Sequence, residues 1–169
     1  MTELITFGET PLRLSPSGNE RLERARQATI HADGTASNVA VAADEIGADT
    51  LWLSKLPDSP LGRRVRSQLE EQGVETNVAW SEEPSHRQGL IFREEGVDPR
   101  ESKSWHDRGN TAAATATPAE FPMDRVQDTE ILFAGLGTAV LSKQATETTG
   151  ALLRAAGGGG AMTAVDLDY

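Results

Sequence analysis

The sequence contains no cysteine, and aromatic residues make up only 5% of it. The absence of cysteine excludes disulfides and thiolate metal sites, although it does not fix the redox compartment. With few aromatics, the core must rely on Leu, Val, Ile and Ala, and 169 residues suffice for one domain. No stretch approaches the roughly 20 apolar residues that span a bilayer, so we expect no membrane segment. The acidic, strand-like start MTELITFGE is unlike a signal peptide, and we expect a cytoplasmic protein.

Lysine is also scarce, because only Lys55, Lys103 and Lys143 accompany thirteen arginines in a chain of net charge −10. Such a charge argues against a nucleic-acid partner, since phosphate contacts need clustered Lys and Arg. An acidic, Lys-poor composition rich in Thr and Ala is similar to that of proteins from salt-loving microbes, where salt screens the self-repulsion. The alternative is an ordinary acidic protein encoded by a GC-rich gene.

Buried strands and amphipathic helices alternate along the chain. Apolar runs at 4–8, 50–56, 130–137 and 161–169 predict strands, and helical spacing predicts helices at 37–46 and 142–156. Between them, DSPLGRRVRSQLEEQG predicts a helix with Ser59 as N-cap and Pro60 in its first position. Its apolar face would hold Leu61, Val65 and Leu69. This alternation predicts an α/β fold with a mostly parallel sheet covered by helices.

Two segments interrupt this alternation. Residues of about 11–32 and 87–108 read as pairs of exposed antiparallel strands, and we expect them to lie together as a flap outside the main sheet.

Several stretches that invite a functional reading have a simpler structural one. The glycines GGGG at 157–160 follow a predicted helix and precede a strand, which is the order of a C-cap and turn and not of a phosphate loop. The three histidines show no metal-ligand spacing. No Gly-x-Ser-x-Gly nucleophile motif is present.

The segment HADGTASNVAVAADEIG (31–47) is more informative, because small residues surround the polar side chain of Asn38 at a predicted helix start. Helix N-termini present free N–H groups, Gly34 permits close backbone approach, and an amide can both donate to and accept from a sugar hydroxyl. Taken alone, an ordinary helix start explains the segment as well as a ligand site does.

The order of several motifs adds to this evidence. LITFGE, DGTASNVAVAADEIG, LWLSKLPDSPLGRRVRSQLEEQGVET, QGLIF, SWHDRGNTAAA and VDLDY resemble, in this order, the first half of the ribokinase-like PfkB sugar kinases. The likeness is greatest to 2-keto-3-deoxygluconate kinases. The resemblance implies a three-layer αβα sandwich with a small β-sheet lid, truncated at the C-terminal side, so that residues 1–169 form the N-terminal part of one domain.

The resemblance also implies site residues. Gly34 and Asn38 lie in the segment that binds sugar hydroxyls, and Arg108 matches a lid arginine that meets the carboxylate of a sugar acid. His106 stands where these kinases carry Tyr and could still donate one hydrogen bond. Ile91 stands at another lid Tyr and can donate none.

Three departures qualify this implied site. Asp33 replaces the first glycine of a Gly-Gly pair and brings a carboxylate to the mouth of the site. Asp168 stands at the Asn of an Asp-x-Asn-x-Arg motif, which we expect on the cofactor side. The Gly-Ala-Gly-Asp motif that supplies the family's catalytic base is absent from the 169 residues, so no catalytic residue is expected here.

We therefore carry three hypotheses. The first is the sugar-binding half of an ATP- and Mg²⁺-dependent sugar or sugar-acid kinase, forming homo-oligomers through the lid as the family commonly does. The second is a non-catalytic sugar-binding or regulatory module of the same fold. The third is a truncated, inactive fragment whose exposed sheet edge would favour aggregation.

Overall fold

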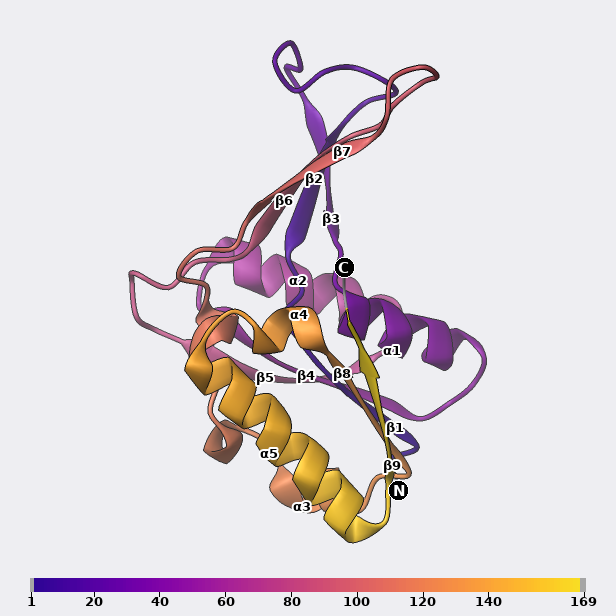
Figure 1. Ribbon diagram of the computed structural model, residues 1–169, viewed down its shortest axis with the longest axis vertical. Helices are drawn as coiled ribbons and strands as arrows, with labels where there is room; N and C mark the ends of the chain where they lie inside the picture. Colours follow the sequence, from indigo (N-terminus) through magenta and orange to yellow (C-terminus); the bar gives the residue numbers. More distant parts are fainter. Residues whose placement is uncertain (1, 168–169) are drawn as a thin grey trace.

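The computed structural model describes residues 2–167 and is built around one parallel sheet (Figure 1). Its strands are β1 (Leu4–Phe7), β4 (Thr50–Pro57), β5 (Glu75–Ser81), β8 (Ile131–Gly135) and β9 (Met162–Asp166). They lie in the order β5-β4-β1-β8-β9, and every neighbouring pair is parallel. The α/β class expected from the alternation of strands and helices is confirmed.

Helices cover both faces of this sheet. Helices α1 (Thr35–Glu45) and α2 (Pro60–Glu70) lie on one face, and α3 (Met123–Gln127) and α5 (Lys143–Gly159) lie on the other (Figure 1). Three short elements complete the chain: α4 (Leu136–Ala139) and the 3₁₀ turns η1 (Ala112–Thr115) and η2 (Pro118–Glu120). No helix within residues 2–167 is both long and apolar enough to cross a membrane.

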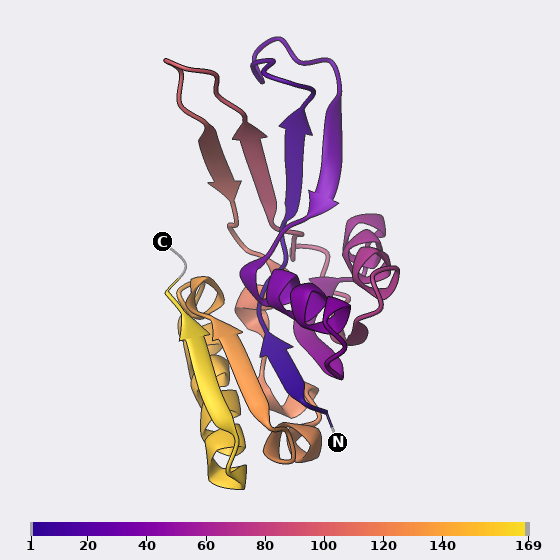
Figure 2. The same ribbon diagram turned by 90° about the vertical axis from the view of Figure 1, so that its right-hand side faces the viewer.

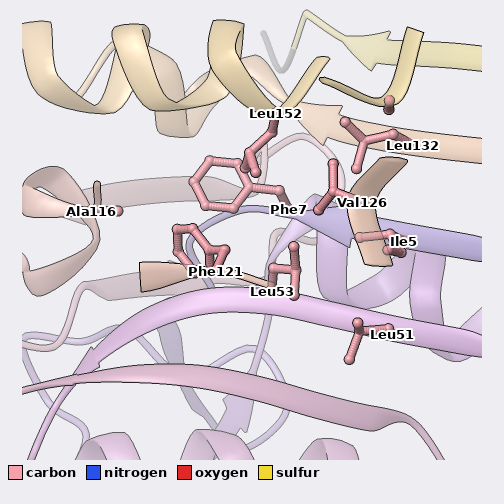
Figure 3. Close-up of a cluster of buried hydrophobic side chains, with 10 residues drawn as sticks. Ile5, Phe7, Leu51, Leu53, Ala116, Phe121, Val126, Leu132 and Leu152 are labelled. Atoms are coloured by element: carbon pink, nitrogen blue, oxygen red, sulfur yellow. The ribbon is translucent and has the colours of Figure 1, made fainter. Parts of the chain in front are cut away.

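The two faces of the sheet carry separate apolar cores. Successive side chains of a strand point to opposite faces, so Leu51 and Leu53 of β4 join Phe7 and Leu152 beneath α5, as Figure 3 shows. Trp52 points the other way, into the core under α1 and α2. The three-layer arrangement follows from this alternation.

Helix α2 begins as its sequence predicts, because the Ser59 hydroxyl accepts a hydrogen bond from the Gly62 amide at 3.2 Å. Val65 and Leu69 are buried, but Leu61 is 43% exposed, so its place on the buried face was predicted wrongly. The neighbouring residue Gly62 is buried instead, and a Cβ there would lie 2.1 Å from the Pro57 carbonyl oxygen. The helix therefore approaches β4 too closely for any side chain at that position.

The glycine run at 157–160 also differs from its prediction. Helix α5 continues through Gly159, and only Gly160, at φ +97°, forms the left-handed cap. A Cβ on Gly159 would lie 2.0 Å from the Gln127 carbonyl oxygen at the end of α3. Close packing of the two helices accounts for a glycine inside α5.

A second sheet of four strands, here called the lid, projects from the end of the main sheet (Figure 2). It consists of β2 (Leu12–Pro16), β3 (Ala28–Ala32), β6 (Leu90–Glu94) and β7 (Lys103–Asp107), in the order β3-β2-β6-β7. The β2–β3 and β6–β7 pairs are antiparallel, whereas β2 and β6 pair in parallel. Both central strands leave the main sheet in the same direction, and this joins the two segments into one sheet.

The register of the lid gives it two distinct faces. Arg13, Ile91 and His106 are direct neighbours across β2, β6 and β7. One residue along each strand, Leu14, Phe92 and Trp105 form the corresponding row on the opposite face. One face thus carries the charged and polar side chains of Arg13 and His106, here called the charged face, and the other carries an apolar row at its centre, here called the apolar face.

Candidate functional site

A cleft lies where the charged face of the lid meets the carboxyl ends of β1 and β8. In parallel α/β sheets this end of the strands is the usual position of ligand sites. The space open to water is about 110 Å³. The lining residues come from four parts of the fold: Glu9, Pro11, Asp33, Gly34, Thr35, Ala36, Ile91, His106, Arg108, Gly135 and Thr138.

An ion pair between Glu9 and Arg108 lies in the wall of this cleft. Glu9 follows β1 and Arg108 follows β7, so the pair joins the main sheet to the lid. The Arg108 Nε donates to Glu9 Oε2 at 2.5 Å, and an Arg108 terminal nitrogen donates to the Gly137 carbonyl oxygen at 2.9 Å. The Glu9 side chain is only 2% exposed, against 24% for Arg108. The guanidinium is thus held in place with part of its donor capacity still free.

The surroundings of Glu9 leave little room around its carboxylate. Its backbone amide donates to the Thr138 hydroxyl at 2.8 Å. Its Oε1 is buried and has no hydrogen-bond partner among residues 2–167. A Cβ on Gly89 would lie 2.5 Å from that oxygen, so a larger residue there would displace the carboxylate.

The start of helix α1 packs equally tightly against the segment after β1. Gly34 is the N-cap residue of α1, and a Cβ on it would lie 2.5 Å from the Glu9 carbonyl oxygen and 2.8 Å from the Thr10 Cα. Gly34 has extended backbone dihedrals, so glycine is required here by space and not by conformation.

Asp33 is held by two side chains. Its Oδ2 accepts from an Arg13 terminal nitrogen at 2.9 Å, and its Oδ1 accepts from the Asn38 side-chain amide at 3.1 Å. Arg13 belongs to lid strand β2, so this ion pair is a second link between the lid and the main domain.

A larger cavity of about 410 Å³ continues from the cleft along the lid. The two share Asp33, Ile91 and His106, and the larger one is also lined by Arg13, Arg93, Ser104 and Asp166. A hydrogen bond from Arg93 to the Glu95 carboxylate raises the pKa of the Arg93 guanidinium above its ordinary value. This face of the lid therefore carries two arginines, Arg13 and Arg93, above the end of the sheet.

The structure brings four of the predicted site residues together. Gly34, Ile91, His106 and Arg108 line the cleft. The ring of His106 has no hydrogen-bond partner within residues 2–167, so it is free to donate to a ligand. Asn38 instead lines a neighbouring pocket between α1 and α2 and reaches the cleft only through its hydrogen bond to Asp33. Asp168 lies outside the described residues.

Sequence reasoning did not select Glu9, Arg13 or Thr138. A weak signal existed for Glu9, because an acidic residue directly after a buried strand and a glycine lies at the ligand end of the sheet. Glu9 and Arg108 are 99 residues apart, so nothing local in the sequence shows that they pair.

The described residues do not by themselves form a metal site. Within residues 2–167, no three His, Asp or Glu side chains gather closely enough to hold an ion. The charged groups of the cleft are paired arginines and carboxylates, which suit a polar organic anion better than a metal.

Comparisons with known proteins agree on the kind of protein. The model of the family described as pfkB family carbohydrate kinase matches residues 1–167. A 2-dehydro-3-deoxygalactonokinase from Haloferax volcanii is 47% identical over 167 residues, covering 99% of this chain and 52% of the relative. A 2-dehydro-3-deoxygluconokinase from Bacillus subtilis is 26% identical over 125 residues, covering 74% of this chain and 38% of the relative.

The same similarity holds for the fold. The crystal structure of a 2-dehydro-3-deoxygluconokinase from Thermotoga maritima superposes with a TM-score of 0.93 at 29% identity, covering all of this chain and 52% of that one. The chain thus spans about half the length of these first relatives. Since the family match extends over nearly every residue, the chain belongs to the pfkB family of carbohydrate kinases.

Proposed function

We propose that this chain carries the sugar-binding half of a kinase that phosphorylates a hydroxyl of a 2-keto-3-deoxy sugar acid. The observation that carries the proposal is the guanidinium of Arg108, fixed by Glu9 in a cleft of polar groups. A guanidinium with free donors is suited to bind a carboxylate. The other polar side chains that line the cleft are suited to bind hydroxyls. The relatives named for 2-dehydro-3-deoxy sugar acids support this substrate class.

The cleft supplies recognition of the sugar acid, not the whole reaction. Phosphoryl transfer also needs positioned phosphates, a metal ion and a base for the attacking hydroxyl. In a complete kinase we expect ATP and Mg²⁺ to serve these needs together with residues beyond this half. The assignment of Asp168 to cofactor binding remains a prediction.

A non-catalytic sugar-binding module remains the second candidate, and Ile91, which offers no hydrogen bond where the family has Tyr, is the observation that favours it. Calorimetric titration of the 169-residue chain with 2-dehydro-3-deoxygalactonate tests the proposal. Binding of the sugar acid is expected. If the sugar acid does not bind at millimolar concentration, the proposal is contradicted. A polypeptide that contains this chain and is as long as its relatives separates the two candidates. Phosphoryl transfer to the sugar acid by this polypeptide indicates the kinase, and its absence indicates the module.

We also propose that the protein works in the cytoplasm at high salt. Its net charge of −10 and its similarity to a protein of a halophile support this. Because salt screens the repulsion between carboxylates, we expect the melting temperature to rise by more than about 5 °C between 0.1 M and 2 M KCl. Calorimetry in both buffers measures the change. A melting temperature that is equal in the two buffers contradicts this proposal and favours an ordinary acidic protein.

The apolar face of the lid supports a homodimer. Ile30, Leu14, Phe92 and Trp105 form one row across all four lid strands, and Trp105 is 47% exposed. A second copy packed on this row would remove it from water. We expect a dimer in sedimentation equilibrium and a monomer for Trp105→Glu, whereas Thr29→Glu, at an exposed residue on the other face, should stay dimeric. A monomeric wild-type protein contradicts the proposal.

A further inference from the structure

Asp33 places a carboxylate in a cleft that is proposed to bind an anion, and its surroundings explain how this is tolerated. Asp33 lines both the cleft and the larger cavity, and its side chain is 29% exposed. Arg13 offsets its charge through the 2.9 Å ion pair, and Asn38 occupies its second oxygen at 3.1 Å. Each carboxylate oxygen can accept about two hydrogen bonds, so both oxygens retain acceptor capacity.

Asp33 and Arg108 are held by different partners in the cleft. Arg13, which holds Asp33, lies on β2, and β6 lies between it and His106 on β7. Arg13 and His106 are therefore two strand spacings apart, about 10 Å. Arg108 lies beyond the end of β7, where Glu9 and the Gly137 carbonyl oxygen hold its guanidinium, whereas Arg13 and Asn38 hold the Asp33 carboxylate. One side of the cleft thus presents a cation with free donors, and the other presents a held carboxylate that can only accept.

This polarity matches the two ends of a sugar acid. We propose that Asp33 determines specificity by accepting hydrogen bonds from the hydroxyl end of the substrate while Arg108 binds its carboxylate. The proposal rests on the function proposed above and deepens it. In the reverse orientation, the substrate carboxylate would face Asp33 and be repelled by it, and Arg108 would meet neutral hydroxyls in place of a carboxylate. The arrangement therefore selects one orientation, and with it the hydroxyl that can be phosphorylated.

Three ligands distinguish this role from simple repulsion. Calorimetry on the 169-residue chain would use 2-dehydro-3-deoxygalactonate, its uncharged carboxamide, and an analogue without the two terminal hydroxyls. Asp33→Asn should weaken the binding of the acid and of the carboxamide by about tenfold each, because both ligands present the hydroxyls. The affinity for the dehydroxylated analogue should stay unchanged. The ion pair is partly exposed, so this variant is expected to fold. Asp58→Asn, which breaks an exposed Asp–Arg pair beside α2, is the matched control and should change no affinity.

The other outcomes contradict the inference in separable ways. Tighter binding of the acid by Asp33→Asn, with the carboxamide unchanged, would show that Asp33 only repels the substrate. An equal loss of affinity for all three ligands would show that Asp33 has a structural role. Unchanged affinity for all three would show that Asp33 does not contact the ligand. Each of these overturns the inference and leaves the proposed function standing. Failure of the wild-type chain to bind the acid overturns both.

Discussion

Arg108→Ala is expected to abolish measurable binding of a sugar acid and to lower the free energy of unfolding by about 3 kcal/mol. Binding is lost because the carboxylate loses its cationic partner. Stability is lost because the Glu9 carboxylate, only 2% exposed, is left as a buried charge without its ion-pair partner. In a complete kinase the kinetic counterpart is a raised KM for the sugar acid. Calorimetric titration and urea unfolding measure the two effects on the same preparation.

The two effects can be separated through Glu9. In the double variant Glu9→Gln/Arg108→Ala, the buried charge is gone, so much of the lost stability should return while sugar-acid binding stays absent. Glu9→Gln alone should weaken binding less than Arg108→Ala, since the guanidinium keeps its bond to the Gly137 carbonyl. A double variant that binds the sugar acid as the wild type does would remove Arg108 from the site.

Gly34→Ala is expected to lower the free energy of unfolding by about 1–3 kcal/mol and to weaken sugar binding at least tenfold. A Cβ there would meet the Glu9 carbonyl oxygen at 2.5 Å and the Thr10 Cα at 2.8 Å, and both belong to backbone that cannot move aside freely. Helix α1 would have to shift away from the segment that carries Glu9. Thermal unfolding and calorimetric titration report the two losses.

Gly109→Ala provides the comparison for this substitution. Gly109 adjoins Arg108, and a Cβ on it would have no neighbour within 4 Å. Stability and binding close to those of the wild type are expected for this variant. If Gly34→Ala behaves in the same way, the close packing at the start of α1 has no part in forming the site.

The sequence predicts the positions of the main strands and helices well, because apolar runs and helix periodicity are local properties. The strand predicted at 161–169 forms as β9 but is largely exposed, since burial depends on what packs against it. β1, β4 and β8 are apolar runs between turns, and Ser59 and Pro60 mark the start of α2 as the structure has it. Two further errors arise from tertiary contacts. Leu61 is exposed because Gly62 takes the close contact with β4, and α5 extends to Gly159 because it packs against α3.

The site is only partly predictable, for a related reason. Motif resemblance selects Gly34, Ile91, His106 and Arg108, which the fold brings into one cleft. The side-chain partners that hold the cleft in shape come from distant segments: Glu9 for Arg108, and Arg13 for Asp33. Asn38 shows the same limit, since it lines the neighbouring pocket between α1 and α2 and its amide contacts the cleft only through Asp33.

The central claim is that a sugar acid binds between the lid and the carboxyl ends of β1 and β8. A ¹⁵N–¹H correlation spectrum recorded during titration with 2-dehydro-3-deoxygalactonate tests it most directly. The amides of Gly34, Ile91, His106 and Arg108 should shift together with one affinity, while those of Trp80 and Glu82, in a separate groove beside α2, stay in place. Shifts confined to the groove beside α2, or no shifts at all, would contradict the claim.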